Sequence, residues 1–157
     1  MNIRLLEKTD YNKFIDLINQ FRPVGMKIDK EQFSLIYDEI FSNGFIFVIE
    51  DNDTLIGTAK IHLERKFFHK LAIYAHIEDV LIDPSFRGKK LGVKLITHLV
   101  DFCEEKQYYK IKLNCDEKLV NFYERNNFSV SGVDMSRVND KKHNHNKNEK
   151  NDIISSI

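Results

Sequence analysis

The chain has 157 residues, 42% of them hydrophobic, which suits a single domain with one substantial core. Lys and Arg together number 24, as do Asp and Glu, so no overall charge attracts nucleic acid or an anionic membrane. No apolar run approaches the roughly 18 residues of a membrane span, and the N-terminus lacks a signal-peptide core. We therefore expect a cytoplasmic protein that binds neither nucleic acid nor membranes.

The N-terminal third predicts one strand followed by two helices. Residues 2–6 favour a short strand, and Thr9 or Asp10 is a suitable cap for a helix whose apolar residues recur at helical spacing. A Pro-Val-Gly segment then interrupts that spacing. A second helix is expected after Asp29, whose carboxylate can form a capping box with Gln32.

The next segments predict strands joined by turns. Gly44 suits the left-handed position at the end of the second helix, and residues 45–49 are typical of a buried strand. Residues 51–53 predict a hairpin turn to a partner strand over residues 55–63, one face of which packs inward. A charged and aromatic connection then leads to a strand over residues 71–82.

The second half predicts a long helix, a strand, a short helix and a final strand. The long helix is expected to begin at Leu91. Its core-facing positions are Leu91, Leu95, Ile96, Leu99, Phe102 and Cys103. Residues 109–115 alternate as a fifth strand, and Asp116 can cap a short helix that ends at Asn126. Residues 128–138 supply a final strand or pair of strands, so we expect one domain over residues 1–138.

Residues 139–157 have a different composition, dominated by Asn, Asp, Lys and His. They have too few apolar residues to offset their ordering entropy, so we expect a disordered tail. Its two histidines, His143 and His145, reflect this biased composition, and we do not expect them to bind a metal. Cys103 and Cys115 lack metal-ligand spacing, so we expect buried thiols and no metal.

The stretch 76–92 carries the strongest functional signal. A hydrophobic strand ends at Ile82, an Asp-Pro-Ser turn follows, and a basic, glycine-containing loop leads directly into the long helix. Free backbone amides at a helix N-terminus, beside Arg87, Lys89 and Lys90, make an anion site of the kind that holds a pyrophosphate. We therefore expect a nucleotide-like cofactor there.

The loop Arg87-Gly-Lys-Lys-Leu-Gly92 resembles the pyrophosphate loop of the GCN5-related N-acetyltransferases (GNATs). Its usual form there is Arg or Gln, two residues, Gly, one residue, then Gly or Ala, and Lys90 replaces the central glycine. Three further segments are similar to the glucosamine-6-phosphate N-acetyltransferase family within that superfamily: residues 61–69, 75–80, and 109–118 continuing through 121–125. With the loop they cover about residues 57–137.

The resemblance implies an α/β (α+β) GNAT fold, in which helices flank a mixed, mostly antiparallel central sheet. It implies transfer of the acetyl group of acetyl-CoA to the amine of glucosamine 6-phosphate, a step toward UDP-N-acetylglucosamine, in a homodimer with a shared substrate site. It implies the cofactor contacts Val80, Leu81, Ile82, Arg87, Gly88, Lys89, Lys90, Leu91, Gly92, Val93, Asn114 and Tyr123. The implied substrate contacts are Arg22, Lys66, His69, Glu78, Asp79, Tyr109, Lys110 and Arg137.

The implied catalytic residues are Glu78, Asp79, Asn114 and Tyr123. Either Glu78 or Asp79 can accept the proton of the amine, directly or through one water. Adjacent strand residues point to opposite faces unless a bulge turns both toward a site, and the superfamily's strand commonly carries such a bulge. The Val80 N–H is then expected to face the thioester oxygen, an interaction worth roughly 3 to 4 kcal/mol. Tyr123 matches the family tyrosine that assists thiolate departure, in direct transfer without an acyl-enzyme.

Besides Lys90, three positions depart from the family pattern. Asn114 stands where an acidic residue is expected, and Arg22 lies in a loop that supplies a small hydroxyl contact in other members. Arg137 is offset by one from a phosphate-binding arginine, and one residue along a strand reverses its face. Two alternatives therefore stay open: an N-acetyltransferase for another small amine or a protein, and a non-catalytic acyl-CoA-binding module.

Overall fold

The computed structural model describes residues 1–21 and 24–137. The chain divides into two compact units, one over residues 1–113 and a second that begins at Asn114. Arg22 and the expected tail over residues 139–157 lie outside the described residues. Within the described ranges, no helix is long and apolar enough to cross a membrane.

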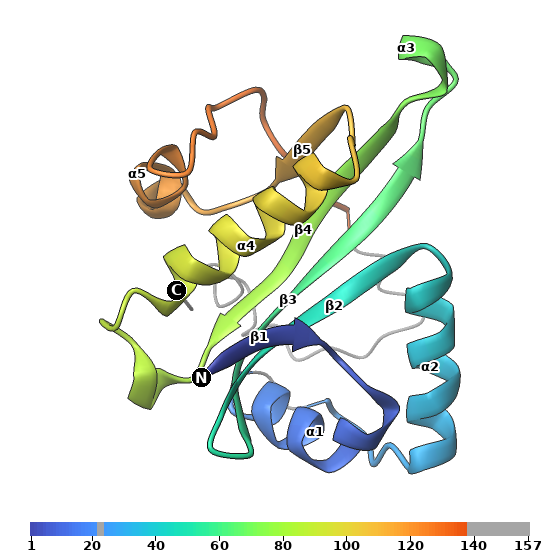
Figure 1. Ribbon diagram of the computed structural model, residues 1–157, viewed down its shortest axis with the longest axis vertical. Coiled ribbons are helices and arrows are strands. Elements are labelled where there is room, and N and C mark those ends of the chain that lie inside the picture. The colour runs from blue at the N-terminus through green and yellow to red at the C-terminus, as the bar shows by residue number, and fades with distance from the viewer. Residues whose placement is uncertain (22–23, 138–157) are drawn as a thin grey trace. The chain divides into compact units, whose positions relative to one another are not determined.

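The first unit is built on a sheet with the order β1-β2-β3-β4-β5 in its described part (Figure 1). Its strands are β1 (Asn2–Leu5), β2 (Gly44–Asp51), β3 (Thr54–Arg65), β4 (Ile73–Ile82) and β5 (Lys110–Leu113). Neighbours from β1 to β4 pair antiparallel, and β5 alone pairs parallel, with β4. The expected mixed, mostly antiparallel sheet is confirmed.

The helices of this unit are α1 (Tyr11–Asn19), α2 (Lys30–Ser42), α3 (Phe68–Leu71) and α4 (Leu91–Glu105), with short 3-10 turns η1 (Lys8–Asp10) and η2 (Pro84–Phe86). Ile46 and Val48 on β2 join the core formed with α1 and α2. The intervening Phe47 packs edge-on against Phe102 of α4, with ring centroids 5.0 Å apart. Because successive strand residues point to opposite faces, α1 and α2 cover one face and α4 the other.

The expected capping box of α2 is present. The Asp29 carboxylate accepts the Gln32 N–H at 2.8 Å, and the Gln32 side chain accepts the Asp29 N–H at 3.1 Å. The hairpin turn at residues 51–53 also forms, because Asn52 and Asp53 take the positive φ angles of a two-residue loop. Both motifs depend only on residues a few positions apart.

The expected role of Gly44 was wrong. It is the first residue of β2 and does not occupy a left-handed helix end. A Cβ at this position would lie 2.1 Å from the backbone oxygen of Ile61 on β3. Glycine is therefore needed for the close approach of two strands.

The second unit contains η3 (Glu117–Leu119) and α5 (Val120–Glu124), and the Asp116 carboxylate accepts the Lys118 N–H at 3.0 Å. The expected final strand over residues 128–138 was wrong for its described part, because residues 128–137 form no strand. Its apolar side chains are 72 to 92% exposed at Val130, Val133 and Met135. They bury too little surface to offset the cost of ordering a strand.

Asp10 also differs from expectation, because its side chain does not cap α1. Its carboxylate accepts two hydrogen bonds from the Arg4 guanidinium, at 2.7 and 2.9 Å, and one from the Glu7 N–H at 2.8 Å. Arg4 also binds Glu50 of β2 at 3.0 Å. The hydrogen bonds from Arg4 lower the pKa of Asp10 more than burial raises it. This network ties β1 to β2 and to the start of α1.

We expect Asp10→Asn to lower the free energy of unfolding at pH 7 by about 2 kcal/mol, because a buried, charge-assisted hydrogen-bond set is lost. The Asp10 carboxylate stabilises the fold above its unfolded pKa of about 3.9, and this contribution disappears as the pH falls through the lower folded pKa. Urea denaturation between pH 2 and 7 should therefore give a flatter profile for the variant.

Asp38→Asn is the matched control, since Asp38 pairs with Lys8 at an exposed position. It should cost less than about 1 kcal/mol. Equal losses for the two variants would contradict the structural role of Asp10.

Candidate functional site

Strand β4 carries a bulge at the acidic pair. Lys60 of β3 lies opposite Glu78 and Thr58 lies opposite Leu81, so Asp79 and Val80 together face a single residue. Asp79 has a φ of +52°, in the left-handed region. A bulge inserts one residue and redirects the side chains around it. The bulge expected from the family resemblance is therefore confirmed.

Both carboxylates of the bulge contact the same cation. The Lys60 Nζ lies 3.0 Å from Glu78 Oε2 and 3.0 Å from Asp79 Oδ2. Burial works to lower the pKa of Lys60, but its hydrogen bonds and charge interactions with the two carboxylates outweigh burial and raise that pKa. The two adjacent carboxylates thus share one side of the strand. Lys60 was not among the expected site residues, because only the register of β3 and β4 brings it to the carboxylates.

The same face of β3 and β4 continues as a polar strip. His62 pairs with His76 across the strands, and Glu64 pairs with Tyr74. His76 Nε2 lies 3.0 Å from Glu64 Oε2, and the other Glu64 oxygen accepts a hydrogen bond from Lys66. The hydrogen bond from Lys66, followed by that with His76, lowers the pKa of Glu64. Glu64 therefore stays ionised and holds Lys66 against this face.

Four of the expected substrate contacts lie at the far end of the strip. The His69 ring stacks on Tyr109 with centroids 4.6 Å apart, and Tyr74 lies 5.7 Å from Tyr109. The Lys66 Nζ lies 5.1 Å from the centre of the Tyr74 ring. Lys110 lies opposite Tyr74 in the β4–β5 register and is exposed. We call Lys66, His69, Tyr74, Tyr109 and Lys110 the basic-aromatic cluster.

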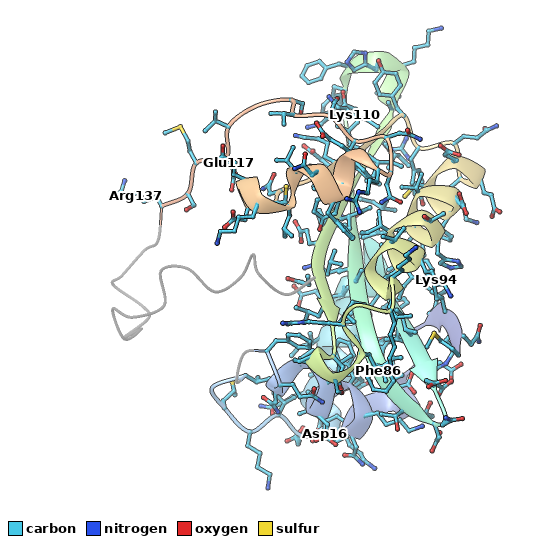
Figure 2. The ribbon with its side chains drawn as sticks, turned by 90° about the vertical axis from the view of Figure 1, so that its left-hand side faces the viewer. Asp16, Phe86, Lys94, Lys110, Glu117 and Arg137 are labelled. Atoms are coloured by element: carbon cyan, nitrogen blue, oxygen red, sulfur yellow. The ribbon has the colours of Figure 1, made fainter. Side chains whose placement is uncertain are left out.

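The expected cofactor loop lies at the other end of β4. Figure 2 shows Phe86 of this loop and Lys110 of the basic-aromatic cluster at opposite ends of the sheet. The loop begins with Asp83, whose carboxylate accepts the Ser85 N–H at 2.8 Å and whose backbone N–H binds the Ile56 oxygen. These bonds fix the start of the loop to β3.

The loop then leaves its own amides available. Gly88 has a φ of +77° and Lys90 a φ of +59°, and within the described chain no hydrogen bond engages the N–H groups of residues 88–90. The first turn of α4 contains no acidic residue. The positive end of the helix dipole and its unpaired N–H groups are therefore uncompensated, as an anion site requires. Arg87, Lys89 and Lys90 are exposed around it.

Tyr123 lies in α5 of the second unit and is 5% exposed. Its ring packs edge-on against Phe122 at 4.9 Å and Phe128 at 6.0 Å. Burial, followed by the charge of Cys115, raises the pKa of Tyr123, so the phenol stays protonated at neutral pH. Asn114 and Arg137 are exposed in the same unit. The approach of these three residues to the bulge stays a prediction.

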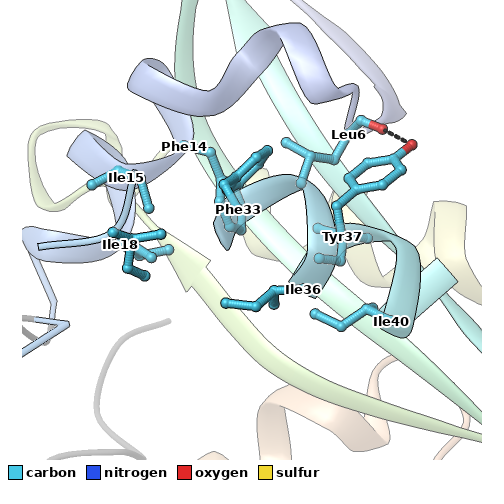
Figure 3. A pocket seen from close by; sticks show the side chains of 10 residues that line it. Leu6, Phe14, Ile15, Ile18, Phe33, Ile36, Tyr37 and Ile40 are labelled. Atoms are coloured by element: carbon cyan, nitrogen blue, oxygen red, sulfur yellow. Dashed lines mark hydrogen bonds between the residues drawn. The ribbon is translucent and has the colours of Figure 1, made fainter. Parts of the chain in front are cut away.

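An apolar pocket lies between α1, α2 and the sheet (Figure 3). Its lining is hydrophobic, and the Tyr37 hydroxyl donates to the Leu6 oxygen at 3.1 Å. It offers no acid, base or cation for chemistry, so we assign it to the helix–sheet core. In the described part of the chain, no group of three or more His, Cys, Asp or Glu side chains could hold a metal ion.

The model of the acetyltransferase (GNAT) family matches residues 11–128. The chain belongs to this family. It is 37% identical over 144 residues to glucosamine 6-phosphate N-acetyltransferase of Arabidopsis thaliana, covering 88% of this chain and 96% of that protein. The Candida albicans enzyme of the same name is 32% identical, covering 84% and 91%. A probable Drosophila melanogaster member is 36% identical over 79% of this chain, which spans only 58% of that protein.

Solved structures agree with the expected fold. The crystal structure of glucosamine-6-phosphate N-acetyltransferase from Arabidopsis thaliana superposes with a TM-score of 0.80 and 35% identity, covering 87% of this chain and 97% of that one. An acetyltransferase from Trypanosoma brucei gives a TM-score of 0.81 and 27% identity, covering 87% and 98%. The family expected from the four sequence segments is therefore confirmed.

We expect the backbone at Lys90 to be the strained position of the cofactor loop. Lys90→Gly and Lys90→Ala both remove the ammonium, but only glycine adopts a φ of +59° without a Cβ penalty. Lys90→Gly should therefore exceed Lys90→Ala in free energy of unfolding by about 1 kcal/mol, measured by urea denaturation.

The matched control is the same pair of substitutions at Lys89, which lacks a positive φ. At Lys89, alanine should be at least as stabilising as glycine. An equal preference for glycine at both positions would contradict this interpretation.

Proposed function

We propose that the protein transfers the acetyl group of acetyl-CoA to the amine of D-glucosamine 6-phosphate, giving N-acetyl-D-glucosamine 6-phosphate and CoA. The observation that carries this proposal is the arrangement of charge along β4. Two carboxylates lie at the bulge, and a basic-aromatic cluster lies at the far end of the same polar strip. An acceptor with an amine at one end and a phosphate at the other suits this arrangement. The relatives' names support the same substrate.

Glu78 and Asp79 bind the amine in the proposed reaction. An amine enters mainly as the ammonium ion, so a carboxylate must accept one proton, directly or through one water, before nitrogen can attack. The carboxylates are about half exposed, at 48% for Glu78 and 65% for Asp79, and can therefore meet an acceptor from solvent. The new C–N bond forms at the thioester carbon, and the Val80 N–H stabilises the negative charge that develops on the carbonyl oxygen.

The loop at residues 87–92 holds the pyrophosphate of acetyl-CoA in this proposal, with Arg87, Lys89 and Lys90 as cations. As the C–S bond breaks, Tyr123 donates its phenolic proton to the departing thiolate, and the second proton that the nitrogen loses as the amide forms returns to the phenolate. A phenol that burial keeps protonated suits this role. Asn114 contributes hydrogen bonding near the thioester, without the charge of an acidic residue.

The cysteines favour direct transfer in a ternary complex over an acyl-enzyme. Cys103 is fully buried, and burial raises its pKa to about 12. Burial also raises the pKa of Cys115. The thiolate is the nucleophilic form of cysteine, and neither side chain forms it readily at neutral pH.

We also propose a cytoplasmic homodimer. Residues 130–135 expose several apolar side chains, as does the α3 turn, where Phe67 is 93% exposed and Phe68 is 70% exposed. Large apolar side chains exposed in each of these segments favour contact with another subunit. Arg137, which follows residues 130–135, would then complete a phosphate site shared between subunits. Sedimentation at micromolar concentration should give twice the monomer mass, and a monomer would contradict the proposal.

The decisive assay measures thiol release from acetyl-CoA with several acceptors. Glucosamine 6-phosphate should be the preferred acceptor, and glucosamine without phosphate should be much slower. Activity confined to a peptide or polyamine would instead favour another N-acetyltransferase. CoA binding without any transfer would favour a non-catalytic module.

We expect Lys66→Met to raise KM for glucosamine 6-phosphate about tenfold, because the phosphate loses one charge-assisted hydrogen bond. KM for acetyl-CoA should not change. Lys70→Met is the matched control, since Lys70 lies on the same connection and contacts no acidic group in the described structure. Equal effects of the two variants would contradict a phosphate role for Lys66.

We expect Tyr123→Phe to lower kcat by about 100-fold, the usual contribution of a positioned acid. Pre-steady-state measurement of thiol release isolates this chemical step. Tyr108→Phe, which removes another hydroxyl whose pKa burial raises, should leave kcat within about twofold of wild type. An unchanged rate of the chemical step in Tyr123→Phe would remove the tyrosine from the mechanism.

A further inference from the structure

Lys60 enters the site from the strand opposite the bulge. It faces Glu78 in the β3–β4 register, and its ammonium lies 3.0 Å from an oxygen of each carboxylate of the pair. Within the described chain, no other cation contacts either carboxylate. Lys60 is the most enclosed of the three groups, at 26% exposure against 48% and 65%. The Lys60 ammonium is therefore nearer the protein interior, beneath the two carboxylates, which lie nearer the solvent.

The bulge places two like charges on adjacent residues of one face. Without a cation between them, their repulsion favours protonation of one carboxylate or rotation of the two apart. The left-handed backbone of Asp79 adds a cost of about 1 to 2 kcal/mol to this arrangement. An opposite charge directly across the strands offsets both effects.

We propose that Lys60 is a positioning residue for acetyl transfer: it holds Glu78 and Asp79 together on one face of the bulge. This inference rests on the proposed function, because it concerns the carboxylates that meet the amine. Lys60 acts through those carboxylates and does not itself touch the reacting atoms.

The remaining oxygens of the pair are available to the acceptor. Lys60 engages Glu78 Oε2 and Asp79 Oδ2, which leaves the second oxygen of each carboxylate for the amine. Two carboxylates and one ammonium leave a net charge of one negative unit. That charge matches a single incoming ammonium group, which then transfers one proton to the pair.

The charge balance also predicts a pH effect. Lys60 supplies the positive charge that the two carboxylates share, and His62 and His76 are the next titratable groups along the same face of β3 and β4. When Lys60 is removed, a proton bound between the two carboxylates relieves their repulsion and persists to higher pH. The acidic limb of the kcat/KM profile for the acceptor should therefore move to higher pH.

The test compares Lys60→Met, Lys60→Arg and the control Lys8→Met. Methionine keeps the length of the side chain without its charge, and arginine keeps the charge. Lys8 pairs with Asp38 away from the bulge, so its variant also loses one lysine–carboxylate pair. Because the bulge carboxylates are well exposed, Lys60→Met should still fold, which circular dichroism would verify.

We expect Lys60→Met to lower kcat with glucosamine 6-phosphate between about 10-fold and 100-fold, the scale of a misplaced reacting group. Its KM for acetyl-CoA should not change, and its acidic limb should move upward. Lys60→Arg should recover most of the loss and Lys8→Met should behave as wild type. Wild-type kcat and an unmoved acidic limb in Lys60→Met would overturn the proposal, and so would tighter acceptor binding with full turnover.

A second measurement separates this inference from the proposed function. Carbon-13 NMR of the side-chain carboxyl groups of Glu78 and Asp79 follows their protonation without any turnover. The pair should accept its first proton at higher pH in Lys60→Met than in wild type. Identical titrations would overturn the role of Lys60. By contrast, if wild-type protein were inactive with glucosamine 6-phosphate but the titration difference appeared, only the proposed acceptor would be wrong.

Discussion

The structure depends on one local constraint, the bulge that places Glu78 and Asp79 on the same face of β4. A regular strand would send adjacent carboxylates to opposite faces, and one of them would enter the apolar layer against α4. The inserted residue avoids this, at the cost of a left-handed backbone at Asp79. Lys60, opposite the bulge, contacts both carboxylates and offsets their repulsion. Local backbone geometry thus creates the chemical centre.

The rest of the sheet supports and orients that centre. Ala75 and Ile77, which alternate with the polar residues of β4, are buried on its other face. This alternation of apolar and polar residues leaves one side of the β3–β4 pair for packing and the other for polar contacts. The loop before α4 and the basic-aromatic cluster lie at opposite ends of β4, with the carboxylates between them. In the proposed reaction, this one strand would order cofactor, amine and phosphate along a single line.

The helices, the hairpin and the family could be predicted because they depend on residues near one another in sequence. The capping box of Asp29 and Gln32 spans four residues, and the loop that resembles the family's pyrophosphate loop spans six. The bulge was predicted from family resemblance, since no local pattern at Glu78 and Asp79 requires it. What could not be predicted depends on register between distant segments. Lys60 meets Glu78, and Arg4 meets Glu50, only after the strands pair.

Two errors have the same physical origin. Residues 128–138 were expected to form a strand, but a strand needs a neighbouring strand to pair with and apolar surface to bury, and local sequence reports neither. Gly44 follows a helix as a left-handed cap does, yet its role is the close approach to Ile61 on a neighbouring strand. Local pattern predicted most of the helices and strands, whereas partners across the sheet decided what each residue does.

A crystal structure of the protein with CoA and glucosamine 6-phosphate tests the central claim most directly. The account predicts the amine nitrogen within about 3 Å of a carboxylate oxygen of Glu78 or Asp79. Lys60 should remain beneath the pair, and the phosphate should contact Lys66 and His69. An amine bound away from the bulge, or a regular β4 strand that separates the two carboxylates, would contradict the account.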